Sequence, residues 1–379
     1  MATVGWLVGA PVPASGGQAT VYALARALER AGHRCTFHLP RLAADDLPSI
    51  ADRLMRWYGV PAERVFAGPA SAAGRDVVIA TDWSGLDPAS QIGAKRVMQF
   101  AQDQEAAFRQ AGDATLLLEA APCCGATTIA LGRWLAAAFA DRYGRRPFVC
   151  DFGVDRDIYR PGDDARDDAV AFILQPGKHR RCPATGLAAL AIVKRRRPRT
   201  IVRLFGDDRP PDVEFAAEAL GRLDRPALGR LYRRSRVGLC LSATNPSRIP
   251  FEMMACGLPV VELYRANTLL DLPEDGALLA FQTPESIAEA ILHLLDRPAA
   301  SGELGRRAAA FMDARGSAVE DAGFVAAFES ALRGEDPPAT QRPPLYRRAP
   351  VVAPAQRNPA TGAFLGRQRA EAGRLAARM

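Results

Sequence analysis

The sequence has little of what would mark a membrane-spanning, metal-binding or nicotinamide-dependent protein. No apolar run approaches the ~20 residues that a membrane-spanning helix needs. The seven cysteines (positions 35, 123, 124, 150, 182, 240 and 256) form no C-x-x-C pair, so buried free thiols in a reducing cytoplasm are a better interpretation than disulfides or zinc ligands. The glycine loop near the N-terminus lacks the G-x-G-x-x-G fingerprint, so a nicotinamide cofactor is not indicated.

Negative charge is scarce in the last part of the chain, which carries most of the formal net charge of +7. Residues 334–379 hold eight arginines against three acidic residues, a net charge of +5, and the rest of the chain is close to neutral. Aromatic residues are not interleaved with this basic run. A nucleic-acid partner is therefore the weakest interpretation of the charge.

The length of 379 residues predicts two domains, because single cores rarely grow beyond about 250 to 300 residues. Residues 1–10 are apolar but have no basic region before them, so we expect a first strand there and not a signal peptide. The expected division is an acceptor domain over 1–155, a donor domain over 156–315, a terminal helix over 316–333 that returns to the first domain, and a tail over 334–379.

Apolar runs alternate with amphipathic stretches through most of the chain. The expected strands are residues 4–10, 34–39, 76–80, 96–100, 148–150, 169–174, 200–205, 237–241, a run starting near 260, and 277–281. The expected helices are residues 18–31, 47–58, 104–111, 129–142, 183–194, 226–234, 284–295, 301–314 and 318–332. This alternation predicts an α/β protein with a doubly wound parallel sheet in each half.

Gly16 and Gly17 end the loop between the first strand and the first helix. A helix N-terminus after such a loop can hold a phosphate or a sugar through backbone NH groups. A plain tight turn is the alternative.

Polar residues directly follow the strand that ends at Phe100. Asp103 and Glu105 lie there, at the carboxyl edge where doubly wound sheets bind ligands. They are candidates for acceptor binding or proton handling, and helix capping by Asp103 is the alternative.

A basic loop follows the first strand of the second half. Lys178, Arg180 and Arg181 lie in it, and arginine can bind phosphate oxygens in bidentate fashion. The loop is a candidate diphosphate clamp, or else a solvated basic loop.

Residues 241–262 read as a strand end, a loop with Asn245 and Ser247, a short helix from Pro250, and a further strand. Glu252 falls in the first helical turn, where its carboxylate can accept hydrogen bonds from sugar hydroxyls. It can equally cap its own helix.

The tail is rich in proline and arginine up to about residue 360, which predicts disorder. Residues 363–378 can form a basic amphipathic helix that contacts an anionic membrane or a partner, although an inert tail is the alternative.

Several motifs in combination resemble a known family. R-A-G-H-R near the N-terminus, L-G-R-L-D-R-P-A-L-G-R-L-Y-R-R-S-R-V-G-L in the middle and P-F-E-M-M-A-C-G-L-P-V-V resemble the retaining glycosyltransferases of family 4, which have the GT-B fold. F-A-Q-D-Q-E-A-A-F, D-F-G-V-D-R-D-I-Y-R-P and N-P-S-R-I-P-F-E-M-M-A are similar to bacterial rhamnosyltransferases that build surface glycans. The resemblance covers roughly residues 1–330.

The resemblance implies two facing Rossmann-like domains, with the nucleotide donor bound mainly by the second. By position, Glu252 would bind the ribose of the nucleotide, and Gly221, Arg222 and Leu223 would border the base. The segment from Ser247 through Pro250 to Phe251 would face the diphosphate or the sugar. No metal is expected, because protein cations would stabilise the leaving diphosphate.

Two positions depart from the pattern of the family. The family usually carries an earlier glutamate, with seven residues between it and the later one; that position is Thr244 here, and an expected arginine is Gln175. These departures leave the donor sugar and the stereochemical outcome open.

The sequence thus predicts a metal-independent, hexosyl-type glycosyltransferase that needs no cofactor beyond a nucleoside-diphosphate sugar as co-substrate. The acceptor would be a hydroxyl of a glycan, a lipid-linked glycan or a small molecule, and rhamnose is one candidate sugar. The expected location is the cytoplasm, with peripheral contact at the inner membrane face as a further option. A sugar-nucleotide epimerase or phosphorylase on the same fold, and a degenerate GT-B module that scaffolds a biosynthetic complex, are the alternatives.

Overall fold

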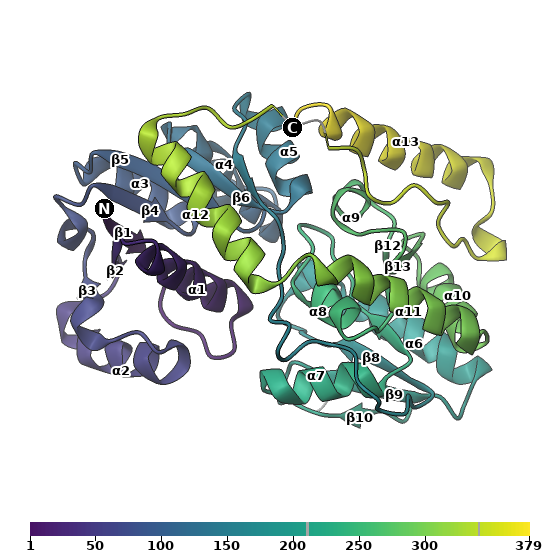
Figure 1. Cartoon of the computed structure of the whole chain (residues 1–379). Helices are drawn as coiled ribbons and strands as arrows, with labels where there is room; N and C mark the ends of the chain where they lie inside the picture. The colour runs from purple at the N-terminus through teal and green to yellow at the C-terminus, as the bar shows by residue number, and fades with distance from the viewer. Residues whose placement is uncertain (210–211, 340–341) are drawn as a thin grey trace. The chain divides into compact units, whose positions relative to one another are not determined.

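The computed structural model describes residues 1–209, 212–339 and 342–379, and over these residues the chain divides into two compact units (Figure 1). Unit 1 comprises Met1–Asp151, Glu320–Thr340 and Arg378–Met379. Unit 2 comprises Phe152–Val319 and Gln341–Ala377. Neither unit is therefore one continuous stretch of sequence.

Unit 1 is built on a parallel sheet. Its strands among the described residues are β1 (Thr3–Leu7), β2 (Arg34–Leu39), β3 (Val65–Ala67), β4 (Val77–Ala80), β5 (Arg96–Ala101), β6 (Thr127–Leu131) and β7 (Phe148–Cys150). They lie in the order β3-β2-β1-β4-β5-β6-β7, and each neighbouring pair is parallel. The helices described are α1 (Gly16–Arg30), α2 (Leu47–Tyr58), α3 (Trp83–Gln91), α4 (Asp113–Ala120) and α5 (Arg133–Tyr143).

Helix α12 (Ser317–Arg333) supplies the late segment of unit 1. The fully buried ring of Phe324 stacks on Trp6, with ring centroids 5.9 Å apart, and meets Phe100 edge-on at 5.3 Å. Asp321 pairs with Arg30 of α1 at 2.7 Å. The part of α12 from residue 320 onward thus covers β1 and β5 with aromatic side chains.

Unit 2 is built on a second parallel sheet. Its strands in the described part of the chain are β8 (Ala169–Ile173), β9 (Ile201–Phe205), β10 (Glu218–Ala219), β11 (Val237–Leu239), β12 (Val260–Leu263) and β13 (Ala277–Ala280). They lie in the order β10-β9-β8-β11-β12-β13, which is the strand order of a Rossmann sheet. The helices described are α6 (Pro183–Arg196), α7 (Arg225–Arg234), α8 (Ile249–Ala255), α9 (Ala266–Asp271), α10 (Pro284–Leu295), α11 (Pro298–Asp313) and α13 (Pro359–Ala376).

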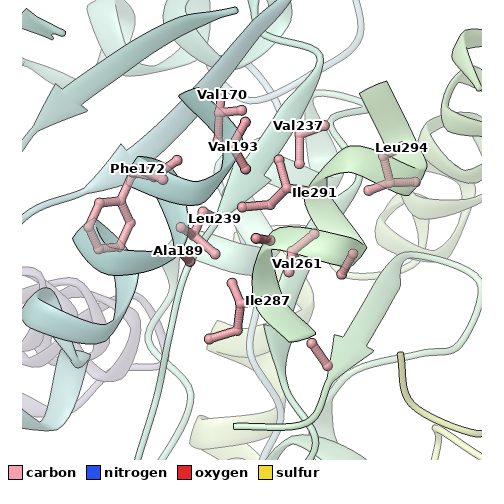
Figure 2. Close-up of a cluster of buried hydrophobic side chains, with 14 of the residues drawn as sticks. Val170, Phe172, Ala189, Val193, Val237, Leu239, Val261, Ile287, Ile291 and Leu294 are labelled. Carbon is pink, nitrogen blue, oxygen red and sulfur yellow. The ribbon is translucent and has the colours of Figure 1, made fainter. Parts of the chain in front are cut away.

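The core of unit 2 lies between its sheet and helices α6 and α10 (Figure 2). Val170 and Val237 of the strands are fully buried there with Ile291 of α10. A Cβ on Gly186 would overlap the ring of Phe172, so the glycine allows α6 to approach β8 closely. The near-continuous apolar strands are typical of parallel sheets that are covered on both faces.

The tail differs from its expected disorder. Tyr346 is 2% exposed, and its hydroxyl oxygen accepts a hydrogen bond from the Leu279 backbone NH at 3.2 Å. Val351 pairs with Ala280 as a parallel bridge at the edge of the sheet. Helix α13, yellow in Figure 1, lies along α9 and contributes a hydrogen bond from the Ala266 NH to Gln368 at 3.1 Å. Residues 342–379 therefore form an ordered strap in the structure, and the tail ends in the expected helix.

Two other local expectations need correction. Residues 129–142 were expected as one helix, but Thr127–Leu131 is strand β6 and the helix begins only at Arg133. The helix expected over 104–111 is a short 3-10 turn, Glu105–Phe108, because Gln104 and Arg109 on either side have non-helical backbone angles.

Candidate functional site

The strand order of unit 2 reverses direction between β8 and β11. The chain runs from β8 outward to β10 and then returns to β11 on the other side of β8. At such a point, two loops leave the carboxyl edge of the sheet in opposite directions, and ligands of open α/β sheets bind in the crevice between them. The loops concerned are residues 174–182 and 240–248.

These two loops are hydrogen-bonded to each other. The Ala243 NH donates to the carbonyl oxygen of Arg180 at 2.9 Å. Arg181 donates through Nη1 to Ser242 Oγ at 2.8 Å and to the Asn245 carbonyl oxygen at 2.9 Å. Arg181 is 8% exposed and Asn245 is 1% exposed, so both residues hold the loops together from inside the protein.

A group of cations surrounds Lys178 at this edge. Partial desolvation and, after it, the positive charges of Arg180, Arg181 and Arg222 lower the pKa of Lys178 to about 8. Pro183 follows at the start of α6, whose N-terminal NH groups add positive electrostatic potential. Arg180 and Arg222, which are less buried than Arg181, come from loops after different strands and can both reach a polyanion.

Hydrogen bonds from the segment after β9 hold the loop after β10 in place. Gly221 has a φ of +63°, a conformation that favours glycine, and its carbonyl oxygen accepts from the Gly206 NH at 2.8 Å. The Arg222 NH donates to Asp208 Oδ1 at 2.8 Å, and Leu223 is half-buried. The predicted base-bordering segment is thus a fixed turn beside the cation group.

Glu252 is a half-buried residue of α8, and its carboxyl group interacts with Arg248, Arg225 and Tyr159. Burial raises the pKa of Glu252 to about 7, against the lowering effects of Arg248, Arg225 and a hydrogen bond from Tyr159. Its Oε2 is buried and has no hydrogen-bond partner among the described residues, and Arg248, the residue that precedes α8, makes no side-chain cap. An unpartnered buried oxygen is uncommon in a folded protein, which makes Glu252 a candidate for binding a ligand hydroxyl.

The remaining predicted residues of this segment differ in exposure. Ser247 is partly exposed, and its hydroxyl lies 3.6 Å from Cys240 Sγ. Pro250 is buried, and the buried ring of Phe251 stacks on Phe152 with centroids 4.5 Å apart. Gly257, with a φ of +69°, follows the helix in the left-handed conformation that commonly ends helices. Phe251 and Pro250 thus fix α8, whereas Ser247 can face a ligand.

Glu262 is a buried residue of this region that was not predicted from the sequence. It lies on β12 with no exposed surface, and burial raises its pKa to about 7. Its Oε1 accepts from the Ser242 and Leu263 backbone NH groups, both at 2.8 Å. The available signal was a single carboxylate within the otherwise apolar run V-V-E-L.

Unit 1 has its own hollow, of about 210 Å³, at the carboxyl edge of its sheet. It lies where the strand order reverses between β1 and β4, and Gly17, Tyr22, Asp82 and Gln102 are among its lining residues. Ser15 caps α1 by accepting from the Gln18 NH at 3.4 Å. The Tyr22 hydroxyl has no hydrogen-bond partner among the described residues, although the side chain is 1% exposed. These carboxyl, amide and hydroxyl groups suit a ligand that both donates and accepts hydrogen bonds.

The other predicted residues of unit 1 lie near this hollow in sequence. Gly17 lies against Gln102, since a Cβ there would be 3.4 Å from Gln102 Oε1, whereas Gly16 has open space around it. Glu105 accepts from the Trp83 NH at 2.9 Å, at the start of α3, and Asp103 accepts from the Gln104 NH at 2.9 Å. Neither acid is among the residues that line the hollow.

No group of three or more His, Cys, Asp or Glu side chains in the described residues is placed to hold a metal ion. No helix in the described part of the chain combines the length and hydropathy needed to cross a membrane.

Comparison with known proteins places this geometry in context. A family model described as WsaF, C-terminal domain, matches residues 168–292. The chain is 31% identical over 251 residues to the O-antigen biosynthesis protein RfbC of Myxococcus xanthus, in a match that covers 62% of this chain and 19% of that protein. The chain therefore spans about a fifth of the length of this relative.

Two solved structures resemble the chain over most of its length. Alr3699/HepE of Anabaena, in complex with UDP-glucose, superposes with a TM-score of 0.68 at 17% identity, over 87% of this chain and 100% of that one. A mutant of TarM from S. aureus, in complex with fondaparinux, alpha-GlcNAc-glycerol and UDP, gives a TM-score of 0.66 at 9% identity, over 87% and 100% of the two chains. Together with the two parallel Rossmann-like sheets, these likenesses confirm the expected GT-B fold.

Proposed function

We propose that the protein is a glycosyltransferase that takes a sugar from a nucleoside diphosphate and passes it to a hydroxyl group of a glycan or a lipid-linked glycan. UDP is the first candidate nucleotide, since two similar structures hold UDP or UDP-glucose. The likeness to an O-antigen biosynthesis protein supports a polysaccharide acceptor. A hexosyl donor, with rhamnose as one candidate sugar, remains our prediction, as does a cytoplasmic location with contact at the inner membrane face.

The observation that carries this proposal is the arrangement of charged side chains where the strand order of unit 2 reverses, between β8 and β11. Lys178, Arg180 and Arg222 gather beside the N-terminus of α6, while Glu252 keeps an unpartnered carboxylate oxygen near Arg225. Cations and helix NH groups bind a diphosphate, and a carboxylate binds sugar hydroxyls. The same cations would stabilise the charge that develops on the diphosphate as it leaves.

The acceptor side belongs to unit 1 in this proposal. The hollow lined by Tyr22, Asp82 and Gln102 offers donors and acceptors for a hydroxyl-rich ligand. Asp103 and Glu105 stay our predicted residues for acceptor binding or proton handling. Each of the two carboxyl groups accepts a hydrogen bond from a backbone NH, Asp103 from Gln104 and Glu105 from Trp83.

Calorimetry with a panel of nucleoside diphosphates, followed by assays of diphosphate release from the matching sugars, tests the proposal. Lys178→Ala and Arg222→Ala should each weaken nucleotide binding by about ten- to a hundredfold, because a hydrogen bond to a charged group contributes about 1.5–3 kcal/mol. Glu252→Gln should weaken it less, since the amide still offers an oxygen acceptor. Arg306→Ala is the control, because that arginine is exposed on α11 and pairs with Glu303 of the same helix.

Three results would redirect the proposal. Binding of no nucleotide in the panel would contradict it. Conversion of the sugar nucleotide without an acceptor would identify an epimerase. Nucleotide binding without turnover, whatever the acceptor, would favour the scaffolding alternative.

Metal independence is a separate prediction. Arginine and lysine side chains would supply the positive charge that Mg²⁺ supplies in other transferases, so excess EDTA should leave the initial rate within about twofold of its value with Mg²⁺. A rate that collapses in EDTA and returns with Mg²⁺ or Mn²⁺ would contradict it.

A further inference from the structure

A buried polar cluster underlies the loop after β11, and its members come from three different elements. Glu262 lies on β12, Asn267 on α9 and Arg181 at the end of the loop after β8. Their exposed fractions are 0%, 3% and 8%. Such burial is costly for polar and charged groups unless they bind one another or the backbone.

Each of the three binds the same short segment, residues 242–245. Glu262 Oε1 accepts from the Ser242 NH at 2.8 Å. Arg181 Nη1 donates to Ser242 Oγ at 2.8 Å and to the Asn245 carbonyl oxygen. Asn267 Nδ2 donates to the carbonyl oxygens of Ser242, at 3.0 Å, and of Thr244.

The cluster thus satisfies the backbone of a loop that has left the sheet and no longer has a strand partner. Buried backbone groups need such partners, so the loop has one conformation only while the cluster is intact. Arg181 also binds Ser242 from the other side, and its positive charge favours the ionised form of the Glu262 carboxyl.

The loop also connects the cluster to the cations at the surface. The Ala243 NH donates to the Arg180 carbonyl oxygen at 2.9 Å, so a displaced loop would release the backbone of Arg180. Glu262 has no exposed surface, and therefore acts through the loop and not on a ligand.

We propose that Glu262, with Asn267 and Arg181, is a positioning residue that fixes the loop at 242–247 and, through it, the nucleoside-diphosphate site at Arg180 and Ser247. The inference that the ligand is a nucleoside diphosphate rests on the proposed function; the fixing of the loop does not. Thr244 belongs to the fixed segment, at the position where the resembled family has a glutamate.

Hydrogen exchange tests the loop without any ligand. In Glu262→Ala the amides of residues 240–248 should exchange about tenfold faster or more than in the wild type, because local opening becomes easier. In Glu262→Gln the exchange should stay within a few-fold of the wild type, because the amide oxygen still accepts from Ser242. Unchanged exchange in a folded Glu262→Ala protein would overturn the proposal.

Affinity for UDP, measured by calorimetry, tests the consequence for binding. Glu262→Ala should lose about tenfold or more in affinity, and Glu262→Gln should restore most of it. Asn267→Ala, which breaks the other side of the loop, is the second variant should Glu262→Ala fail to fold, and it should show the same two effects.

Thr200→Val is the matched control. Thr200 has no exposed surface and donates to Asp168 at 3.3 Å, but it lies at the amino edge of the same sheet. It should lower the melting temperature and leave both loop exchange and UDP affinity unchanged. If Thr200→Val weakens UDP binding as much as Glu262→Ala, the effect is general destabilisation and the proposal fails.

A wild type that binds no nucleoside diphosphate would contradict the proposed function, and the exchange measurement would still decide the role of Glu262. A wild type that binds UDP, together with a folded Glu262→Ala protein of equal affinity, would contradict only the present inference.

Discussion

Glu252 and Glu262 are two buried carboxyl groups whose pKa is raised to about 7, mainly because burial disfavours their charged forms. The folded protein therefore binds their protons more tightly than the unfolded chain does. This tighter proton binding adds to the free energy of unfolding. The contribution is complete below about pH 4.5, the ordinary pKa of glutamate, and is lost as the pH rises through about 7.

Glu262→Gln should remove part of this pH dependence. A raised pKa of about 7 against 4.5 corresponds to about 3 kcal/mol of stability between the two ends of the window. Urea unfolding at intervals from pH 4.5 to 7.5 should show a free energy of unfolding that falls less steeply in the variant than in the wild type. Identical slopes in the two proteins would show that Glu262 does not titrate in this range.

Individual residues were the least predictable part of the site. The sequence placed three cations in the loop after β8, but only the fold shows that Arg181 turns inward to Ser242 while Lys178 stays at the surface. Residue type and spacing carry no information on which side chain of a loop is buried. Glu262 was missed for a related reason, because Ser242, which it holds in place, lies 20 residues earlier in the sequence.

Among the elements, the strap formed by residues 342–379 makes the clearest prediction. Tyr346 is buried against Tyr264, with ring centroids 6.3 Å apart, and accepts from the Leu279 NH. Tyr346→Ala should lower the free energy of unfolding by about 3–5 kcal/mol, the usual cost of deleting a buried aromatic ring. Tyr346→Phe should cost only about 1 kcal/mol, the net contribution of one hydrogen bond.

Urea unfolding of the two variants separates an ordered strap from a disordered one. If the strap were disordered in solution, Tyr346→Ala and Tyr346→Phe would both leave the midpoint of unfolding unchanged. Arg357→Ala is a control within the strap, because that side chain is exposed and, among the described residues, donates to the Val352 carbonyl oxygen alone.

Elements with a strong pattern were predicted well, and those with a mixed pattern were not. Leu47–Tyr58 has the bounds that the sequence indicated, because its apolar face repeats at helical spacing. Most of strand β6 was predicted to be helical, because its apolar run continues past Gly132 into the alanine-rich α5. The part of the strap up to about residue 360 was expected to be disordered because of its proline and arginine content, but Tyr346 and Val351 anchor it to the edge of the sheet.

At the scale of the whole molecule, α12 makes unit 1 depend on a segment far along the chain. Phe324→Ala should destabilise unit 1 by about 3–5 kcal/mol, since the ring packs on Trp6 and Phe100 with no exposed surface. UDP affinity of unit 2 should stay within about twofold of the wild type, because the aromatic contacts of Phe324 lie within unit 1 and sites without shared partners act independently. Calorimetric unfolding and UDP titration of the same sample check both statements. A loss of affinity equal to that of Glu262→Ala would contradict the second one.

The interleaving of the two units along the chain also constrains how donor specificity can be exchanged. Unit 2 consists of Phe152–Val319 and Gln341–Ala377, separated by the α12 segment of unit 1. A chimaera that imports the nucleotide-binding half of a relative with a single crossover would pair a foreign sheet with the native strap, and Tyr346 would meet surfaces it was not selected to fit. Grafting must therefore transfer both stretches together, and recombination between such genes would yield folded hybrids mainly when the crossovers flank both.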